Sequence, residues 1–253
     1  MAHSPELEAA LSAAEAAARV IRECYLKPID IRTKGDGTPV TEADVRSEQA
    51  IREVLSAQFP DYAFFGEETG RSGTGENIWI VDPIDGTKSF VRGYPFFSTL
   101  IALERKGTLT LGVSSAAIYG ELAWAERGAG AFLNGRPIAV SGISSFEGAT
   151  LSTGNMDSFA ASPRWARLGE LVPRFHRTRG YGDFLNYHLL AAGKIEAVIE
   201  TDINILDLAA LVPIVEEAGG RFTTLEGEPI TQDAQSVLAT NGHLHEELLA
   251  AFN

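Results

Sequence analysis

The sequence predicts an α+β fold, with an antiparallel sheet in its N-terminal half and a second, mixed sheet in its C-terminal half. Residues 96–140 hold short apolar segments that follow one another closely and are divided by glycine-containing turn pairs, which is typical of an antiparallel meander. Farther along the chain, strand-like segments alternate with helical ones, which indicates a sheet flanked by helices. We expect an N-terminal lobe at 1–145 and a C-terminal lobe at 146–253, divided within the Ser/Gly-rich stretch 141–148.

Two amphipathic helices are expected at the start of the N-terminal lobe. Ser4-Pro5-Glu6 provides a capping hydroxyl and a proline at the first helical position, and apolar residues then recur at steps of four and three until Pro28 ends the pattern. Thr41 begins the second helix. Its inward face is expected to carry Val45, Ile51, Val54 and Leu55. Between the helices, residues 34–39 carry turn residues without periodicity and predict a mobile loop.

The remaining elements follow from apolar patterns bounded by turn residues. In the N-terminal lobe, strands are expected at 96–104, 108–117, 122–125 and 131–140, after two strand-like fragments that end in acidic residues. In the C-terminal lobe, strands are expected at 149–153, 175–179 and 195–200 and near Phe222 and Val237, with helices at 158–171, 184–192, 206–218 and from His243.

The composition predicts an ordinary globular protein with an acidic surface. The chain has 34 Asp and Glu against 21 Lys and Arg, a net charge of −13, which argues against a nucleic-acid partner. Its short basic run, residues 174–179, is interpreted as a polar strand edge. No apolar run approaches the roughly 20 residues of a membrane span. The single cysteine, Cys24, is placed on a buried helix face, and without signal-peptide features we expect a reducing, cytoplasmic location.

Four acidic residues stand out because of their positions. Glu67 and Asp82 each end a strand-like segment, Asp85 lies in the following turn, and Asp207 begins a helix. Carboxylate and carbonyl oxygens suit Mg²⁺ or Mn²⁺. Both aspartates of the turn are followed by Pro or Gly, pairs that are also common in plain turns, so the local pattern leaves a turn and a metal site both open. The Gly-Thr pair that comes next favours a site for metal and phosphate.

The segment Asp82-Pro83-Ile84-Asp85-Gly86-Thr87 resembles the signature of the inositol monophosphatase superfamily, whose members are Mg²⁺-dependent, lithium-sensitive phosphomonoesterases. Companion motifs occur in the family's order at 41–44, 66–68, 207–210 and 216–220. Several ordered motifs that cover nearly the whole chain are far more specific than any one motif. The resemblance implies a five-layer αβαβα sandwich with its site between the lobes, and a homodimer.

The resemblance also implies roles for individual residues. The metal ligands would be the side chains of Glu67, Asp82, Asp85 and Asp207 and the carbonyl oxygen of Ile84. Thr87, beside Glu67, would orient the nucleophilic water, and the amides of Gly86 and Thr87 would hold the phosphate, with Asp85 and Asp207 also facing the substrate. Asp44 would help to hold the last-bound metal. Alternatively, its carboxylate could have only a local role, interacting favourably with the positive N-terminus of its helix. Leu206 stands where many members have tryptophan, which leaves the neighbouring ligand intact.

Within the superfamily, three stretches resemble the histidinol-phosphate phosphatase branch: residues 85–93, 179–184 and 207–211. L-Histidinol phosphate carries an ammonium group and an imidazole, so an acid near the leaving group is the expected complement. Asp183 and Glu200 are the candidates. Asp183 could also cap the helix that it begins, and Glu200 could be a solvated strand end. Lys88 could attract the phosphate or simply lie exposed.

We therefore expect a Mg²⁺-dependent phosphomonoesterase, with Mn²⁺ as a substitute, that hydrolyses L-histidinol phosphate in histidine biosynthesis by direct attack of metal-activated water. Within the same class, the alternative is an inositol-1-phosphatase or a phosphatase of many sugar and polyol phosphates. In a different class, some members of the superfamily serve as partners of the transcription or ribosomal machinery. The acidic charge balance disfavours direct contact with RNA in that role.

Overall fold

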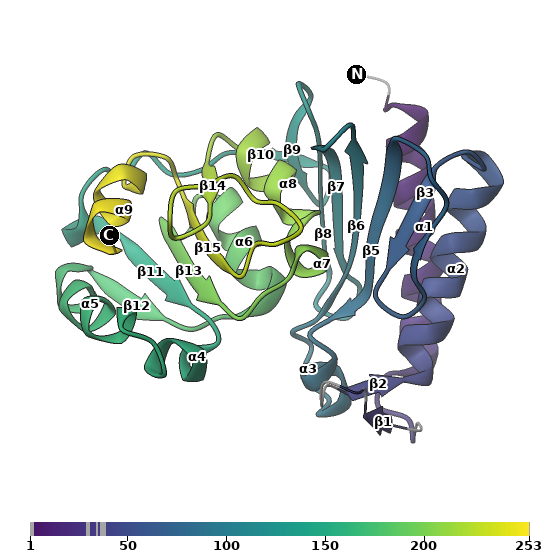
Figure 1. Cartoon of the computed structure of the whole chain (residues 1–253), viewed down its shortest axis with the longest axis horizontal. Helices are drawn as coiled ribbons and strands as arrows, with labels where there is room; N and C mark the ends of the chain where they lie inside the picture. The colour runs from purple at the N-terminus through teal and green to yellow at the C-terminus, as the bar shows by residue number, and fades with distance from the viewer. Residues whose placement is uncertain (1–2, 29–30, 34, 36–38, 253) are drawn as a thin grey trace.

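The computed structural model describes residues 3–28, 31–33, 35 and 39–252 (Figure 1). The mobile loop predicted at 34–39 falls largely outside the described residues. A short hairpin that the sequence did not indicate flanks that segment. Its strands, β1 (Ile31–Thr33) and β2 (Pro39–Thr41), pair antiparallel.

The first large sheet has the strand order β10-β9-β8-β7-β6-β5-β3-β4 within the described residues. Its strands are β3 (Ala63–Gly66), β4 (Gly70–Ser72), β5 (Asn77–Asp85), β6 (Ser98–Arg105), β7 (Thr108–Ala116), β8 (Glu121–Glu126), β9 (Gly130–Leu133) and β10 (Arg136–Ile138). Neighbouring strands run antiparallel except β3 and β5, which are parallel. This one parallel pair departs from the predicted antiparallel sheet, and it brings the ends of β3 and β5 to the same edge.

The second sheet is mixed, as predicted, with the order β12-β11-β13-β15-β14. Its strands are β11 (Thr150–Thr153), β12 (Arg177–Arg179), β13 (Ala197–Thr201), β14 (Arg221–Thr223) and β15 (Ser236–Thr240). β11 runs parallel to β12 and β13, whereas β15 runs antiparallel to β13 and β14. The basic run at 174–179 ends in the edge strand β12, whose two arginines are exposed.

Helices complete five layers (Figure 1). The outer layer beside the first sheet holds α1 (Pro5–Cys24) and α2 (Glu42–Gln58). Between the two sheets lie α6 (Asp183–Ala191), α7 (Ile205–Leu208) and α8 (Leu211–Glu217). The outer layer beside the second sheet holds α4 (Met156–Ala160), α5 (Arg164–Leu171) and α9 (His245–Phe252). None of the described helices has the length and apolarity needed to span a bilayer.

The first two helices begin where the sequence predicted them, but α1 ends at Cys24 and not at Pro28, because Leu26 takes a left-handed backbone with φ 62°. Ser4 accepts a hydrogen bond from the Leu7 amide at 3.1 Å and Pro5 occupies the first turn of α1, and Cys24 is buried at the end of that helix. In α2, Ile51 and Leu55 face the core, and Val54 packs against it. Val45 was predicted to face inward, but it is 49% exposed. The buried stripe of α2 runs through positions 44, 48, 51 and 55, and Val45 lies one residue, about 100°, away from it.

Two predicted helices are each divided into two. Pro163 interrupts the helix expected at 158–171, because proline lacks an amide donor and disfavours helical geometry in the residue before it. The helix expected at 206–218 is broken between Leu208 and Leu211. At this corner a Cβ on Gly112 of β7 would lie 1.9 Å from the Ala210 carbonyl oxygen. The corner therefore rests directly on the backbone of the first sheet.

Candidate metal centre and active site

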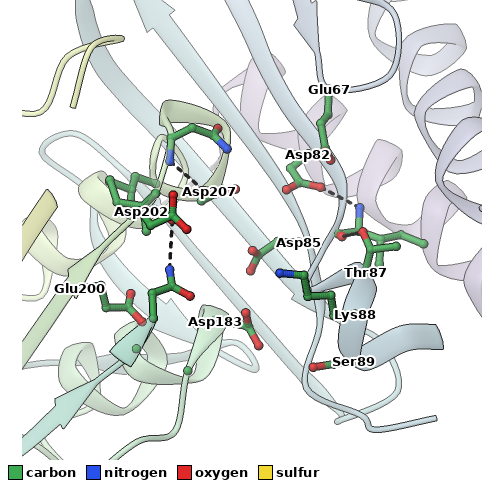
Figure 2. Close-up of a pocket in the computed structure, with 18 of the residues that line it drawn as sticks. Glu67, Asp82, Asp85, Thr87, Lys88, Ser89, Asp183, Glu200, Asp202 and Asp207 are labelled. Carbon is green, nitrogen blue, oxygen red and sulfur yellow. Dashed lines mark hydrogen bonds between the residues drawn. The ribbon is translucent and has the colours of Figure 1, made fainter. Parts of the chain in front are cut away.

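The site is an acidic cavity of about 750 Å³ between the end of β5 and the elements of the second sheet (Figure 2). Residues from both halves of the chain line it, from Pro39 to Leu208. The acidic side chains in its wall are Glu67, Asp82, Asp85, Asp183, Glu200, Asp202 and Asp207. Lys88 extends its amino group toward Asp85 and is the lysine of this wall. The cavity thus carries a large excess of negative charge.

Two of these carboxylates come from a bulge at the end of β5. The pairing of β5 with β6 shifts register between Asp82 and Asp85. The Ile84 amide donates to Asp82 Oδ1 at 2.9 Å, and Thr99 Oγ1 donates to the Pro83 carbonyl at 2.9 Å. These two bonds hold the bulge, so that both aspartates turn their side chains into the same cavity.

The position after the bulge requires glycine, because its backbone is left-handed and closely packed. Gly86 has φ +88° and begins α3 (Thr87–Val91). A Cβ at this position would lie 2.8 Å from the Phe96 carbonyl oxygen. Only glycine tolerates both the left-handed conformation and the close approach.

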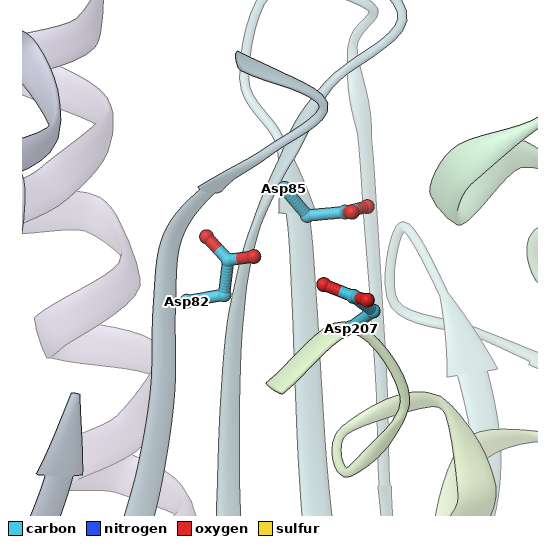
Figure 3. A group of neighbouring side chains, drawn as sticks. All are labelled: Asp82, Asp85 and Asp207. Carbon is cyan, nitrogen blue, oxygen red and sulfur yellow. The ribbon is translucent and has the colours of Figure 1, made fainter. Parts of the chain in front are cut away.

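The third carboxylate of the group arrives from the second half of the chain. Asn204 caps α7 by accepting from the Leu206 amide at 2.7 Å, and Asp207 Oδ2 accepts from the Asn204 amide at 2.8 Å. This reciprocal capping box holds Asp207 in one orientation. One carboxylate oxygen each of Asp82, Asp85 and Asp207 lies within 4.8 Å of the other two (Figure 3).

Glu67 lines the acidic side of the cavity, and Asp44 lies behind it in contact with Thr87. The Glu67 amide donates to Val81, so the parallel pairing of β3 and β5 leads directly to its side chain, which lies beside Asp82 (Figure 2). Asp44 is fully buried, and its Oδ2 accepts from Thr41. Its Oδ1 accepts from Thr87 Oγ1 at 3.3 Å, so Asp44 both caps α2 and contacts the site.

The Thr87 hydroxyl bonds to two groups of the protein. Thr87 Oγ1 donates to the Ile84 carbonyl at 3.0 Å, besides its contact with Asp44. The pairing of Thr87 with Glu67 around a water molecule stays a prediction. The Ile84 carbonyl is nevertheless positioned at the cavity wall together with the acidic cluster.

The electrostatics of the cluster favour a bound cation. Burial, and then the neighbouring Glu67, Asp85 and Asp207 carboxylates, raise the pKa of Asp82 well above its ordinary value. Burial and the Asp183 carboxylate do the same to the pKa of Asp85. Asp85 Oδ2 is buried without a hydrogen-bond partner among the described residues. Several buried oxygens, one of them unpaired, are the donor set that a hard divalent cation takes.

The carboxyl groups predict how the metal-free protein responds to pH. Burial raises the pKa of Asp183 and Asp207 to about 6 and that of Glu200 to about 7, above their ordinary values of 3.8 and 4.5. Between these limits the folded chain binds more protons than the unfolded one, so the free energy of unfolding falls as pH rises. We expect the Tm of chelator-treated protein to fall between about pH 4 and about pH 7, measured by differential scanning fluorimetry. Added Mg²⁺ reverses the fall at the higher pH, whereas a Tm that rises with pH in the metal-free protein contradicts the electrostatic account.

Across the cavity from the β5 bulge, α6 and β13 contribute a second acidic group. Asp183, the first residue of α6, has φ 45°, and the helix has no side-chain cap at Gly182. The alternative weighed for Asp183, an N-cap of α6, is therefore wrong, and its carboxylate faces the cavity (Figure 2). Lys88 moderates the rise in its pKa.

Glu200 was weighed as a solvated strand end, and that interpretation is wrong. Its side chain is buried, and its two oxygens accept from Tyr187 Oη at 2.5 Å and from Asn186 Nδ2 at 2.8 Å. A Cβ on Gly154 would lie 2.0 Å from Glu200 Oε1. The carboxylate is thus held in a fitted pocket made by two residues of α6 and by Gly154, which directly follows β11.

Sequence reasoning missed Tyr187 and Asn155 of the cavity wall, and Asn186, which bonds Glu200 without lining the cavity. Tyr187 and Asn186 look like ordinary helix residues, and only the packing of α6 on β13 directs them at Glu200. Asn155 holds the turn after β13 by donating from Nδ2 to the carbonyls of Thr201 and Asp202 at 2.8 and 3.0 Å. Asn155 has a left-handed backbone, φ 48°. No periodic pattern in the sequence marks such a residue, so the sequence could not have predicted its role.

Comparison with known proteins places this arrangement in a family. Residues 3–253 match the family model described as the inositol monophosphatase family. The chain belongs to that family. A histidinol-phosphatase from Mycobacterium tuberculosis is 41% identical over 261 residues, which cover 100% of this chain and 99% of that protein. An inositol-1-monophosphatase from Caulobacter vibrioides is 36% identical, over 96% of this chain and 97% of that protein.

Solved structures agree with the family assignment. The extragenic suppressor protein suhB from Bartonella henselae superposes with a TM-score of 0.91 at 31% identity, covering 99% of each chain. Members of the family are phosphoric monoester hydrolases and are generally metal-dependent. The chain is accordingly a phosphatase of the inositol monophosphatase family, and its acidic cluster can bind a metal.

Proposed function

We propose that the protein is a Mg²⁺-dependent phosphomonoesterase that hydrolyses L-histidinol phosphate to L-histidinol and phosphate. The observation that carries the proposal is the second acidic group, Asp183 and Glu200, which faces the β5 carboxylates across one cavity. A simple polyol phosphate has no cation to pair with these two carboxylates. The leaving group of histidinol phosphate carries an ammonium and an imidazole, which complement them. The 41% identity to a histidinol-phosphatase supports the same substrate.

The side chains of Glu67, Asp82, Asp85 and Asp207 and the Ile84 carbonyl would hold Mg²⁺, or Mn²⁺ in its place, and Asp44 would support the last-bound ion. When bound, Mg²⁺ lowers the pKa of a coordinated water and neutralises charge on the ester oxygens. The buried, mutually repelling carboxylates and the unpaired Asp85 Oδ2 fit that role.

The chain's own residues would orient the reacting groups. Glu67 and Thr87 would hold the attacking water, and the amides of Gly86 and Thr87 would hold the phosphate. We propose that water attacks phosphorus directly, so that the bond to the leaving alkoxide breaks without a covalent phosphoenzyme. Asp85 and Asp207 would face the substrate from the two halves of the chain.

The deciding experiment is a phosphate-release panel with Mg²⁺ that compares L-histidinol phosphate, inositol-1-phosphate and glycerol 2-phosphate. We expect the highest kcat/KM for histidinol phosphate. A kcat/KM for inositol-1-phosphate equal to or above that value would overturn the substrate assignment while leaving the phosphatase intact. Omitting the metal and adding a chelator should abolish release of phosphate from all three esters.

Asp183→Asn tests the recognition of the leaving group. We expect kcat/KM for histidinol phosphate to fall about 10- to 100-fold, since the variant leaves the ammonium without a charged partner in a partly desolvated site. The value for glycerol 2-phosphate, which has no cation, should change little. Asp157→Asn, an exposed carboxylate on α4, is the matched control. Equal losses for both esters would show that Asp183 does not recognise the leaving group.

Inositol-1-phosphate, or a broad set of sugar and polyol phosphates, is the second candidate substrate, and the 36% identity to an inositol-1-monophosphatase favours it. Its hydroxyl groups could donate hydrogen bonds to the same carboxylates.

A role as a partner of transcription or ribosomal machinery would survive Asp82→Asn, which removes a proposed metal ligand. We further infer a cytoplasmic homodimer with lobes at 1–145 and 146–253, serving histidine biosynthesis. Light scattering of the purified protein tests the dimer.

A further inference from the structure

His188 is a buried histidine that the proposed chemistry does not use. It lies on α6, and its side chain is 1% exposed. Its Nδ1 lies 2.9 Å from Glu121 Oε2, and its Nε2 lies 2.9 Å from Ser114 Oγ. Sequence reasoning interpreted it as a packed helix residue, and it is packed, edge-on against Phe184. Its two hydrogen bonds, however, both leave its own helix for the first sheet.

The arrangement of acid, imidazole and hydroxyl resembles a hydrolytic triad, but it has no access to a substrate. Ser114 is fully buried, and the acidic cavity is not lined by any of the three residues. Burial lowers the pKa of His188, so the imidazole is neutral. Nδ1–H then donates to the Glu121 carboxylate, and Nε2 accepts from the Ser114 hydroxyl. The group acts as a fixed link between elements.

One end of this link leads to the strand that carries the metal-site carboxylates. Ser114 lies in β7, and its Oγ lies 3.5 Å from Ser98 Oγ of β6, a distance at which the Ser98 hydroxyl can donate to it. Ser98 is the residue of β6 that lies opposite Asp85 of β5. His188 is therefore joined through two side chains to the edge of the sheet where Asp85 projects into the cavity.

The other end leads to the acidic group of α6 and β13. The residues just before His188 are Asn186 and Tyr187, whose side chains hold both oxygens of Glu200. One turn farther toward the N-terminus, the same helix begins with Asp183. The buried Asn186 also accepts from Ser152 Oγ of β11 and from the Gly182 amide. This short helix thus connects with the first sheet on one side and with Glu200 on the other.

We propose that His188 is a positioning residue that sets the separation between the two acidic groups of the cavity, and that it thereby determines the preference for phosphate esters with a cationic leaving group. The preference itself rests on the function proposed above. The β5 carboxylates belong to the first sheet. Asp183 lies on α6, and Glu200 is bonded by two side chains of α6. Because His188 bonds α6 to the first sheet, it couples the positions of the two acidic groups. It contributes no group to the reaction.

His188→Asn, in the full-length protein with Mg²⁺, is the test. Asparagine keeps a donor near the position of Nδ1 but cannot reach Ser114. We expect KM for L-histidinol phosphate to rise about tenfold with little change in kcat, because a displaced carboxylate weakens binding of the cation. KM and kcat for glycerol 2-phosphate should stay near their wild-type values. Ser114→Ala removes only the hydroxyl. It should raise KM for histidinol phosphate by a smaller factor and leave the values for glycerol 2-phosphate unchanged.

His245 provides a matched control. It is equally buried and bonds two hydroxyls, Thr223 Oγ1 at 2.9 Å and Thr240 Oγ1 at 3.0 Å, but it lies on α9 beside the far face of the second sheet. His245→Asn should lower the Tm comparably and leave the ratio of the two KM values unchanged. If His245→Asn shifts that ratio as His188→Asn does, or if His188→Asn lowers kcat for both esters in proportion, the role of His188 is only structural and the proposal fails.

Hydrogen exchange decides the question even if histidinol phosphate is not the substrate. That failure would appear in the wild-type protein as a kcat/KM for histidinol phosphate no higher than that for inositol-1-phosphate. In His188→Asn, the amides of residues 183–191 should exchange about tenfold faster, while those of α9 keep their wild-type rates. Unchanged exchange in α6 would overturn the positioning role whatever the substrate is.

Discussion

Asp82→Asn is expected to lower kcat/KM for phosphate release roughly a thousandfold or more, the effect of losing several kcal/mol of charge stabilisation in the transition state. The substitution keeps the shape of the side chain and the acceptor for the Ile84 amide. What it removes is one negative charge from a group of three carboxylates whose nearest oxygens lie within 4.8 Å. The loss should therefore come from weaker metal binding and should diminish in part at high Mg²⁺.

The same variant has an opposite effect on the metal-free fold. Because burial and the neighbouring carboxylates raise the pKa of Asp82 well above its ordinary value, its ionised form opposes folding at neutral pH. We expect chelated Asp82→Asn to have a higher Tm than chelated wild type, by about 2–4 °C for each kcal/mol of repulsion relieved. Calorimetric Tm values with and without Mg²⁺ measure both the weaker metal binding and the higher stability of the metal-free variant. Wild-type activity, or a lower Tm in the chelated variant, would contradict the assignment of Asp82 to the metal centre.

Gly112→Ala is expected to produce the largest loss of stability, about 1–3 kcal/mol or more, because the new methyl group enters a closed contact. Its Cβ would lie 1.9 Å from the Ala210 carbonyl oxygen and 2.8 Å from the Ala210 carbonyl carbon, both backbone atoms that cannot rotate away. The corner between α7 and α8 must then move off β7. Since α7 carries Asp207, the displacement should also raise the Mg²⁺ concentration needed for half-maximal activity.

Gly169→Ala is the control for this substitution. Gly169 is exposed in the middle of α5, and a Cβ there would meet nothing within 4 Å. Alanine at that position should raise stability by about 0.5–1 kcal/mol, because glycine costs more backbone entropy in a helix. In urea unfolding, the free energy of unfolding should therefore fall in Gly112→Ala and rise in Gly169→Ala. If Gly112→Ala unfolds at the wild-type midpoint, the corner is not held against β7 as the structure has it.

The acidic cluster illustrates what a sequence pattern can predict. Asp82, Asp85 and Gly86 lie within one turn, so a short motif is enough to anticipate them. Asp207 is far away in sequence, but the capping box with Asn204 is local, and the family's motif order identified it as a partner. The fold class and most strands were predicted for the same reason, since apolar spacing and turn residues record local geometry.

Other features depended on which surfaces meet. The parallel pairing of β3 with β5 follows from the packing of the whole sheet, and it places Glu67 beside Asp82. Val45 has the apolar character of an inward residue, yet the face of α2 that contacts the sheet is defined by Ile51 and Leu55. The corner that divides the helix expected at 206–218 lies against the backbone of Gly112, about a hundred residues away.

By itself, the sequence determined an α+β fold class from its apolar spacing and turn residues. The phosphatase and the metal-type acidic cluster followed from the resemblance of its short motifs to the inositol monophosphatase superfamily. Only the tertiary structure decided how the cavity is completed. It buried Glu200 against Tyr187 and Asn186, directed the Asp183 carboxylate into the cavity, and connected α6 to the first sheet through His188. These contacts join residues that are far apart in the chain, and hydrogen bonds between such residues leave no periodic trace in the sequence from which they could be predicted.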